Sequence, residues 1–184
     1  MVAAMSFKTI NNVIETWETI RRMPEWEKEI GVGLFAKFFK MEPEAKAIFG
    51  FREDLDVTDY KVLISPRFVA HAMQFVTMID KALNMMGPSD EMLSEILMDI
   101  GAKHARYGVK PEYFPTMGKA LVSVVGSNLG EDVFTMEVQE SWIEVYNAMS
   151  HDMIKGLGEV YTVKKNDIST EIEPQQQVDS AIWT

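Results

Sequence analysis

Two of the three histidines occupy positions from which an imidazole could bind a metal. His71 lies four residues before Phe75 and His104 lies four residues after Ile100, so each borders an apolar helical stripe. Histidines facing inward from two helices can hold one metal from opposite sides. Neither stripe carries a further Asp, Glu or His for a bare metal, whereas iron in a porphyrin needs only one or two axial imidazoles. The pattern favours haem, although a histidine on an apolar face can also be a hydrogen-bonded core residue.

The composition excludes or disfavours several other classes of function. The 184 residues contain no cysteine, which excludes disulfides, zinc-thiolate sites, iron–sulfur clusters and thiol catalysis. The formal net charge of −10 makes nucleic acid and anionic membranes poor partners. No apolar run reaches membrane-spanning length and no signal pattern opens the chain, so we expect a cytoplasmic protein and no membrane contact. With 47% hydrophobic residues, the chain can form one domain that encloses a small cofactor.

Helical spacing of apolar residues along the chain predicts an all-α fold. We expect the first helix to end near Pro24, where the second helix begins. The second helix is expected to run to about Lys40, and a short helical turn is expected at Pro43. Ser65 and Pro66 open the next helix, and Gly87 ends it. The remaining helices are expected at about 90–107, 111–129 and 135–157. Residues 1–157 would form the domain, and residues 158–184, which lose helical periodicity, a polar C-terminal tail.

Two predicted stripes carry the histidines. The third long helix would bury Phe68, Ala72, Phe75, Ile79, Ala82 and Met86, and the fourth would turn Leu93, Ile96, Leu97, Ile100 and His104 to one side. Most of the 14 methionines sit at core spacing, where filling gaps is a commoner role than binding iron. Gly31 and Gly33 lie within a helix and indicate a tight helix crossing. His151 lies off its helix's apolar stripe and is expected in solvent.

Five segments occur in the order and spacing found in globins. They are Trp17 near the end of the first helix, "GLFAKFFKMEPEAKAIF", "SPRFVAHAMQFVTMIDKAL", "IGAKHARYGVKPEYF" and "SWIEVYNAM". From about Ser6 to Leu157 the chain resembles the globin family, and most closely its neuroglobin-like group. The resemblance implies a globin fold, with about eight helices in a three-over-three sandwich around a haem pocket.

The resemblance also implies roles for individual residues. His104 corresponds to the proximal iron ligand and His71 to the distal histidine, while the ring of Phe49 would stack on the haem and Phe35 and Phe75 would line the distal pocket. The other expected cofactor contacts are Phe51, Ile100, Lys103, Val109 and Phe114. The second ring N–H of His104 needs an acceptor, for which we expect a carbonyl near Ile100.

This sequence departs from the family pattern at several positions. Phe75 is larger than the valine or leucine common there and should crowd the ligand space. Gln74 replaces a frequent basic partner of a haem propionate, which leaves Arg67 and Lys103 as candidates. Phe51 stands where neuroglobin-like proteins carry a tyrosine.

The expected function is that of a haem b protein that reversibly binds O2, CO or NO. Resemblance to the neuroglobin-like group favours bis-histidyl, six-coordinate iron in the unliganded protein, with a role in oxygen binding, transport or sensing, or in electron transfer. The alternative is a globin enzyme, such as a nitric oxide dioxygenase, a nitrite reductase or a peroxidase-like protein. It would need a separate reductase as partner, and we consider an enzyme the lesser possibility. A haem-free helical signalling module is a third option. The tail could bind a partner through Ile182 and Trp183, and the sequence leaves the oligomeric state open.

Overall fold

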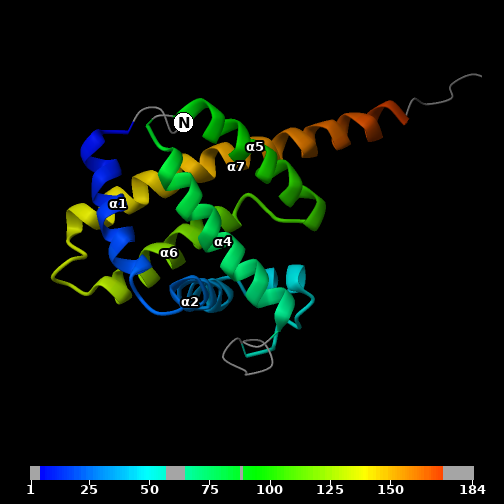
Figure 1. Ribbon diagram of the computed structural model, residues 1–184. Coiled ribbons are helices and arrows are strands. Elements are labelled where there is room, and N and C mark those ends of the chain that lie inside the picture. The colour runs from blue at the N-terminus through cyan, green and yellow to red at the C-terminus, as the bar shows by residue number, and fades with distance from the viewer. Residues whose placement is uncertain (1–4, 57–64, 88, 172–184) are drawn as a thin grey trace, which may run out of the picture.

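The computed structural model describes residues 5–56, 65–87 and 89–171, except for the side chains of Arg67 and of residues 162–171. Every regular element in these ranges is a helix, which confirms the all-α prediction. The elements are α1 (Phe7–Arg21), α2 (Trp26–Met41), η2 (Pro43–Phe49), α4 (Pro66–Met85), α5 (Asp90–His104), η3 (Ala105–Tyr107), α6 (Tyr113–Leu129) and α7 (Met136–Glu171), shown in Figure 1.

Most helix ends agree with the residues that predicted them. Ser6 caps α1, because its hydroxyl accepts the backbone N–H of Thr9 at 3.0 Å. Pro66 occupies the first turn of α4, where its missing N–H costs nothing, and Gly130 follows the last residue of α6. The start of α2 was predicted wrongly: the helix begins at Trp26, and Pro24 belongs to the preceding turn.

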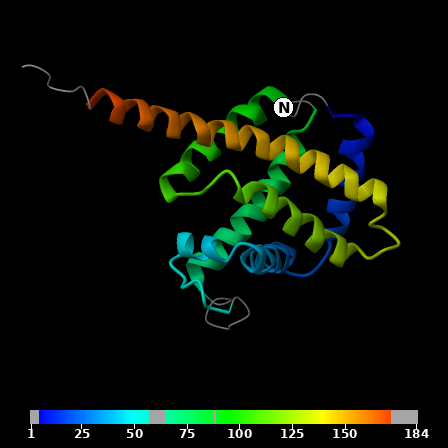
Figure 2. The same cartoon turned by 180° about the vertical axis from the view of Figure 1, so that it is seen from behind.

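Helices α4 and α5 form a V that positions the two histidines. They are joined at residues 86–89 and diverge toward the start of α4 and the end of α5, as Figures 1 and 2 both show. Helix α7 crosses α5 and packs along it more extensively than any other pair of elements, while α2 packs against α4. Each arm of the V is therefore supported by another helix.

Three tryptophans form a cluster that ties α1 to its neighbours. The Trp17 ring lies 5.5 Å from that of Trp26 and 5.6 Å from that of Trp142. The indole N–H of Trp142 donates to the hydroxyl of Thr16 at 3.0 Å, and that of Trp17 donates to Asp80 of α4 at 3.0 Å. Because both indole donors have partners, the large rings can be buried without leaving an unsatisfied N–H.

The two glycines of α2 have different surroundings. A Cβ added at Gly31 would lie 2.6 Å from the backbone oxygen of Ala72, so the crossing of α2 and α4 requires glycine there. At Gly33 the nearest atom to an added Cβ is Cγ1 of Val124, at an ordinary 3.8 Å. The predicted tight crossing is confirmed for Gly31 and wrong for Gly33.

The last helix is longer than predicted. Instead of ending near Leu157, α7 continues to Glu171, and its C-terminal end projects beyond the body in Figures 1 and 2. Residues 158–171 contain no proline, and Gly158 alone costs a helix only about 1 kcal/mol, so a polar sequence can continue the helix. Ile182 and Trp183 lie outside the described residues.

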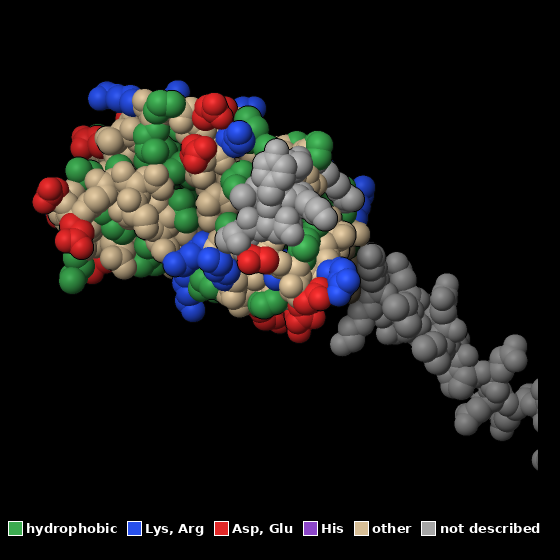
Figure 3. Space-filling model, turned by 90° about the horizontal axis from the view of Figure 1, so that it is seen from below, with side chains coloured by type: hydrophobic (Ala, Val, Ile, Leu, Met, Phe, Trp, Pro, Cys, Tyr) green, Lys and Arg blue, Asp and Glu red, His purple; other side chains and the backbone are tan. Residues whose placement is uncertain are grey.

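The surface carries charged side chains of both signs. Acidic and basic side chains are scattered over the face shown in Figure 3, and His151 is exposed as expected. Ile96 was expected on the inward stripe of its helix, but it is 41% exposed. The inward face of α5 is centred on Leu93, Leu97 and Gly101, which places Ile96 at the edge of that face. Among the described residues, no helix has both the length and the apolar character that crossing a membrane requires.

Candidate functional site

The imidazole of His104 is held by the backbone of its own helix. His104 is the last residue of α5, and its Nδ1 lies 2.7 Å from the carbonyl oxygen of Ile100, one turn earlier. A carbonyl oxygen only accepts, so this bond requires the tautomer in which Nδ1 carries the proton. The lone pair of Nε2 is then available to bind a metal. This is the acceptor that the sequence predicted.

His71 lies in an aromatic cluster on the opposite arm of the V. Its ring centroid is 5.5 Å from that of Phe35 and 5.2 Å from that of Phe49, both in edge-to-face geometry. Phe75, one turn further along α4, contacts Phe35 at 5.7 Å. The Phe49 and Phe51 rings are stacked at 6.4 Å with an interplanar angle of 11°. The structure thus places the three predicted distal residues, His71, Phe35 and Phe75, beside the two predicted haem contacts Phe49 and Phe51.

Both histidines lie at the same distance along their arms. His71 precedes Met86 by 15 residues and His104 follows Ser89 by 15 residues. At a rise of about 1.5 Å per residue, the backbone of each histidine lies about 22 Å along its helix from the joined end of the V. The two histidines therefore occupy corresponding positions on the two arms of the V.

The remaining predicted cofactor contacts are three apolar residues that are at least half-buried, Ile100, Val109 and Phe114, and the exposed Lys103. Ile100 and Val109 are half-buried near His104, and the N–H of Val109 donates to the carbonyl of His104 at 3.4 Å. Phe114 is buried at the start of α6. Lys103 is exposed and paired with Asp99 at 2.5 Å, so it would have to leave this ion pair to reach a propionate.

Three residues near the site were not predicted. Phe68 was expected only in the core, yet its ring contacts those of Phe35, Phe49 and Phe51. Lys46 is buried, and its ammonium donates to the carbonyls of Glu53 at 2.6 Å and Leu55 at 2.8 Å. Lysines are usually exposed, so its sequence position gave no signal.

Tyr161 is the third such residue. Its hydroxyl donates to the carbonyl of Val109 at 3.0 Å, which links α7 to the segment that follows His104. Its spacing could have indicated this contact only if the last helix had been predicted to continue past Leu157.

The donor set fits a porphyrin better than a bare ion. Among the described residues, no group of three or more His, Asp or Glu side chains could hold a metal by itself. The arms of the V instead offer one imidazole each, one of them fixed by a carbonyl, beside aromatic rings suited to a flat apolar group.

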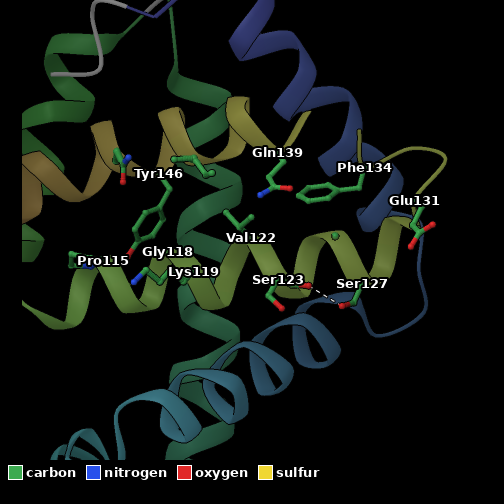
Figure 4. Close-up of a pocket in the computed structure, with 14 residues that line it drawn as sticks. Pro115, Gly118, Lys119, Val122, Ser123, Ser127, Glu131, Phe134, Gln139 and Tyr146 are labelled. Atoms are coloured by element: carbon green, nitrogen blue, oxygen red, sulfur yellow. Dashed lines mark hydrogen bonds between the residues drawn. The ribbon is translucent and has the colours of Figure 1, made fainter. Parts of the chain in front are cut away.

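A groove lies between α6 and α7. It has a volume of about 870 Å³ and is lined by residues that include Lys119, Phe134 and Tyr146 (Figure 4). No histidine lines it. The hydroxyl of Tyr146 donates to the carbonyl of Phe114 at 2.8 Å, and burial raises the pKa of Tyr146 well above its usual range, so this donor stays protonated. The groove therefore offers no imidazole to haem iron.

Comparisons with known proteins agree with this geometry. The family model described as Globin matches residues 32–153. Neuroglobin from Tetraodon nigroviridis is 29% identical over 126 residues, covering 68% of this chain and 77% of that protein. Neuroglobin from Dissostichus mawsoni is 25% identical over 143 residues, covering 77% and 85%.

Solved structures show the same fold. A globin of Drosophila melanogaster superposes with a TM-score of 0.69 at 18% identity, covering 82% of this chain and 94% of that chain. A hexacoordinated heme protein from an anhydrobiotic tardigrade, at pH 4, superposes with a TM-score of 0.71 at 20% identity, covering 84% and 96%. From the family match and the shared fold, we conclude that this chain belongs to the globin family and is similar to neuroglobins.

Proposed function

We propose that this chain is a haem b globin that binds O2, CO or NO reversibly, with His104 as the permanent axial ligand and His71 as a second, displaceable one. Globin membership implies haem and the binding of diatomic gases. The observation that carries the assignment of His104 is its 2.7 Å contact with the carbonyl of Ile100, which leaves Nε2 available for iron. When bound, haem supplies the iron at which such gases bind.

His104 would act as a preorganised ligand. The carbonyl of Ile100 fixes the ring tautomer and orientation and makes Nε2 a better electron donor. Because this acceptor belongs to the helix backbone, the orientation does not depend on a second side chain.

His71 would control access of external ligands. If its imidazole ligates the iron, a gas binds only the fraction of molecules in which His71 has moved away, and the apparent dissociation constant rises by the inverse of that fraction. If it stays off the iron, it can donate a hydrogen bond to a bound ligand, and such bonds to charged groups are worth about 1.5–3 kcal/mol. The similarity to neuroglobins and to the hexacoordinated tardigrade protein supports the first state for the unliganded protein.

The phenylalanines would set the size and polarity of the ligand space. Phe35 is 2% exposed and contacts both His71 and Phe75, so movement of His71 must take place against a rigid aromatic wall. The Phe49 ring also contacts the His71 ring, at 5.2 Å, and would face the porphyrin with Phe51. Together these apolar rings would limit the access of water to the imidazole, which would strengthen the polar contacts that it makes.

The test is a titration of the purified apoprotein with hemin, followed by reduction and addition of CO. The proposal expects saturation at one hemin per chain and a shift of the ferrous spectrum with CO. A protein that stays colourless with excess hemin would contradict it.

The domain boundary belongs to the same proposal. We propose that residues 1–157 form the haem-binding domain, with residues 158–184 as an appendage. The family match to residues 32–153 supports this division, and the contact of Tyr161 with Val109 indicates that the first part of the appendage touches the domain.

A further inference from the structure

Two glycines make a reciprocal backbone contact where α5 crosses α7. A Cβ added at Gly101 of α5 would overlap the carbonyl oxygen of Met153, and would lie 2.7 Å from that carbonyl carbon and 2.9 Å from that Cα. A Cβ added at Gly156 of α7 would overlap the carbonyl oxygen of Met98, with 2.6 Å and 2.8 Å to the corresponding atoms. Each helix thus places a backbone carbonyl against the glycine of the other.

In an isolated helix each glycine would cost about 1 kcal/mol relative to alanine, so packing must account for glycine at these two positions. Here both are buried, and no flexible side chain separates the two backbones at these points. The carbonyls face the hydrogens that a Cβ would replace, an arrangement suited to weak Cα–H···O contacts between helices. The two glycines therefore permit the close backbone approach of α5 and α7 at this crossing.

The crossing involves the turn of α5 that holds the proposed iron ligand. Gly101 directly follows Ile100, whose carbonyl binds Nδ1 of His104, and it precedes His104 by three residues. A displacement of the α5 backbone at Gly101 must move both the carbonyl and the ring that it orients. Packed interiors transmit such displacements rather than absorb them.

Resting on the proposed function, we propose that the reciprocal contact of Gly101 and Gly156 holds the last turn of α5 against α7 before haem binds, so that His104 is already in its ligating position in the apoprotein. The two glycines are positioning residues, since neither is proposed to touch the cofactor. Preorganisation of this kind reduces the ordering that binding would otherwise require.

The first experiment uses apoprotein and needs no cofactor. Amide hydrogen exchange is measured by NMR in the wild type and in Gly101→Ala, Gly156→Ala and Gly158→Ala. An added Cβ at Gly158, in the same helix α7, meets nothing within 4 Å, so that variant is the matched control. We expect the α5 amides to be protected in the wild type, to exchange at least tenfold faster in the first two variants, and to change less than twofold in the control. Unprotected α5 amides in the wild-type apoprotein would overturn the proposal.

The second experiment separates positioning from general stability. Loss of hemin to excess apomyoglobin is timed in the wild-type background and in a His104→Gly background supplied with free imidazole, where the ligand is not tethered to α5. We expect Gly156→Ala to accelerate hemin loss at least tenfold in the first background and less than twofold in the second. Equal acceleration in both would show a merely structural role and overturn the proposal.

Two further outcomes are distinguishable. If the wild type takes up no hemin, the proposed function fails. If it takes up hemin but Gly101→Ala and Gly156→Ala match Gly158→Ala, only the positioning inference fails. Should both alanine variants not fold, the wild-type apoprotein decides: NOEs between the α-protons of Gly101 and Met153 support the docked helix, and their absence overturns it.

Discussion

Replacement of Gly31 by alanine should destabilise the fold, whereas the same change two residues later should stabilise it. In α2 both changes gain about 0.8–1.0 kcal/mol of helix propensity. At Gly31 the new Cβ would start 2.6 Å from the oxygen of Ala72 and must move to at least 3.0 Å, so the backbones of α2 and α4 must separate by about 0.4 Å. Such overpacking costs about 1–3 kcal/mol.

The expected net effect is a loss of about 0–2 kcal/mol for Gly31→Ala and a gain of up to about 1 kcal/mol for Gly33→Ala. The assay is urea unfolding of the apoproteins, compared at a constant m-value. With m at about 1–3 kcal/mol per molar urea, a difference of about 2 kcal/mol separates the two midpoints by roughly 1 M. Identical midpoints for the two variants would refute the assignment of a tight crossing to Gly31 alone.

Three further outcomes are expected. Tyr146→Phe removes the donor to a buried α6 carbonyl and should lower the free energy of unfolding by about 1–3 kcal/mol in urea titrations; an unchanged midpoint would contradict the buried bond. Thr16→Val leaves the indole N–H of Trp142 without its acceptor and should cost a similar amount, while Thr19→Val on the exposed side of α1 should cost less than about 0.5 kcal/mol; equal losses would count against the contact. His71→Leu should convert the reduced, ligand-free protein to five-coordinate iron, and an unchanged spectrum would mean that His71 does not bind iron. If the distal site of the wild type is open about 1% of the time, the same change should tighten apparent CO binding about a hundredfold.

Helical spacing was sufficient to predict the all-α class and the helices that carry the histidines, whereas the globin arrangement of those helices was expected from the family resemblance. The stripe from Phe68 to Met86 is inward apart from the half-buried Phe75, and Pro66 and Gly130 mark helix ends as expected. These predictions depend on local rules, namely periodicity and the backbone preferences of proline and glycine, which a sequence displays directly.

The errors concern features set by tertiary contacts. The extension of α7 past Leu157 goes with the hydrogen bond from Tyr161 to Val109, which joins segments 52 residues apart. The exposure of Ile96 follows from the direction in which α5 meets α7, and neither direction nor proximity is visible in the spacing of one helix. The burial of Lys46 likewise depends on two loop carbonyls that accept hydrogen bonds from its ammonium group. The sequence predicts the loop but not the direction of these carbonyls.

The roles of glycines in helices were the least predictable. Gly31, Gly33, Gly101, Gly156 and Gly158 all interrupt apolar helical patterns, yet an added Cβ would overlap or crowd a neighbouring helix at only three of them. A sequence shows the loss of helix propensity at each glycine but not which backbone approaches it. The close crossing of α5 and α7 could therefore be recognised only in the structure.

The most direct test of the account is the visible absorption spectrum of the dithionite-reduced, ligand-free protein, recorded for hemin-reconstituted wild type and His104→Ala. We expect sharp, split bands of six-coordinate iron in the wild type, and loss of the pigment or a changed spectrum when the imidazole held by Ile100 is removed. Retention of the pigment in His104→Ala with an unaltered spectrum would contradict it.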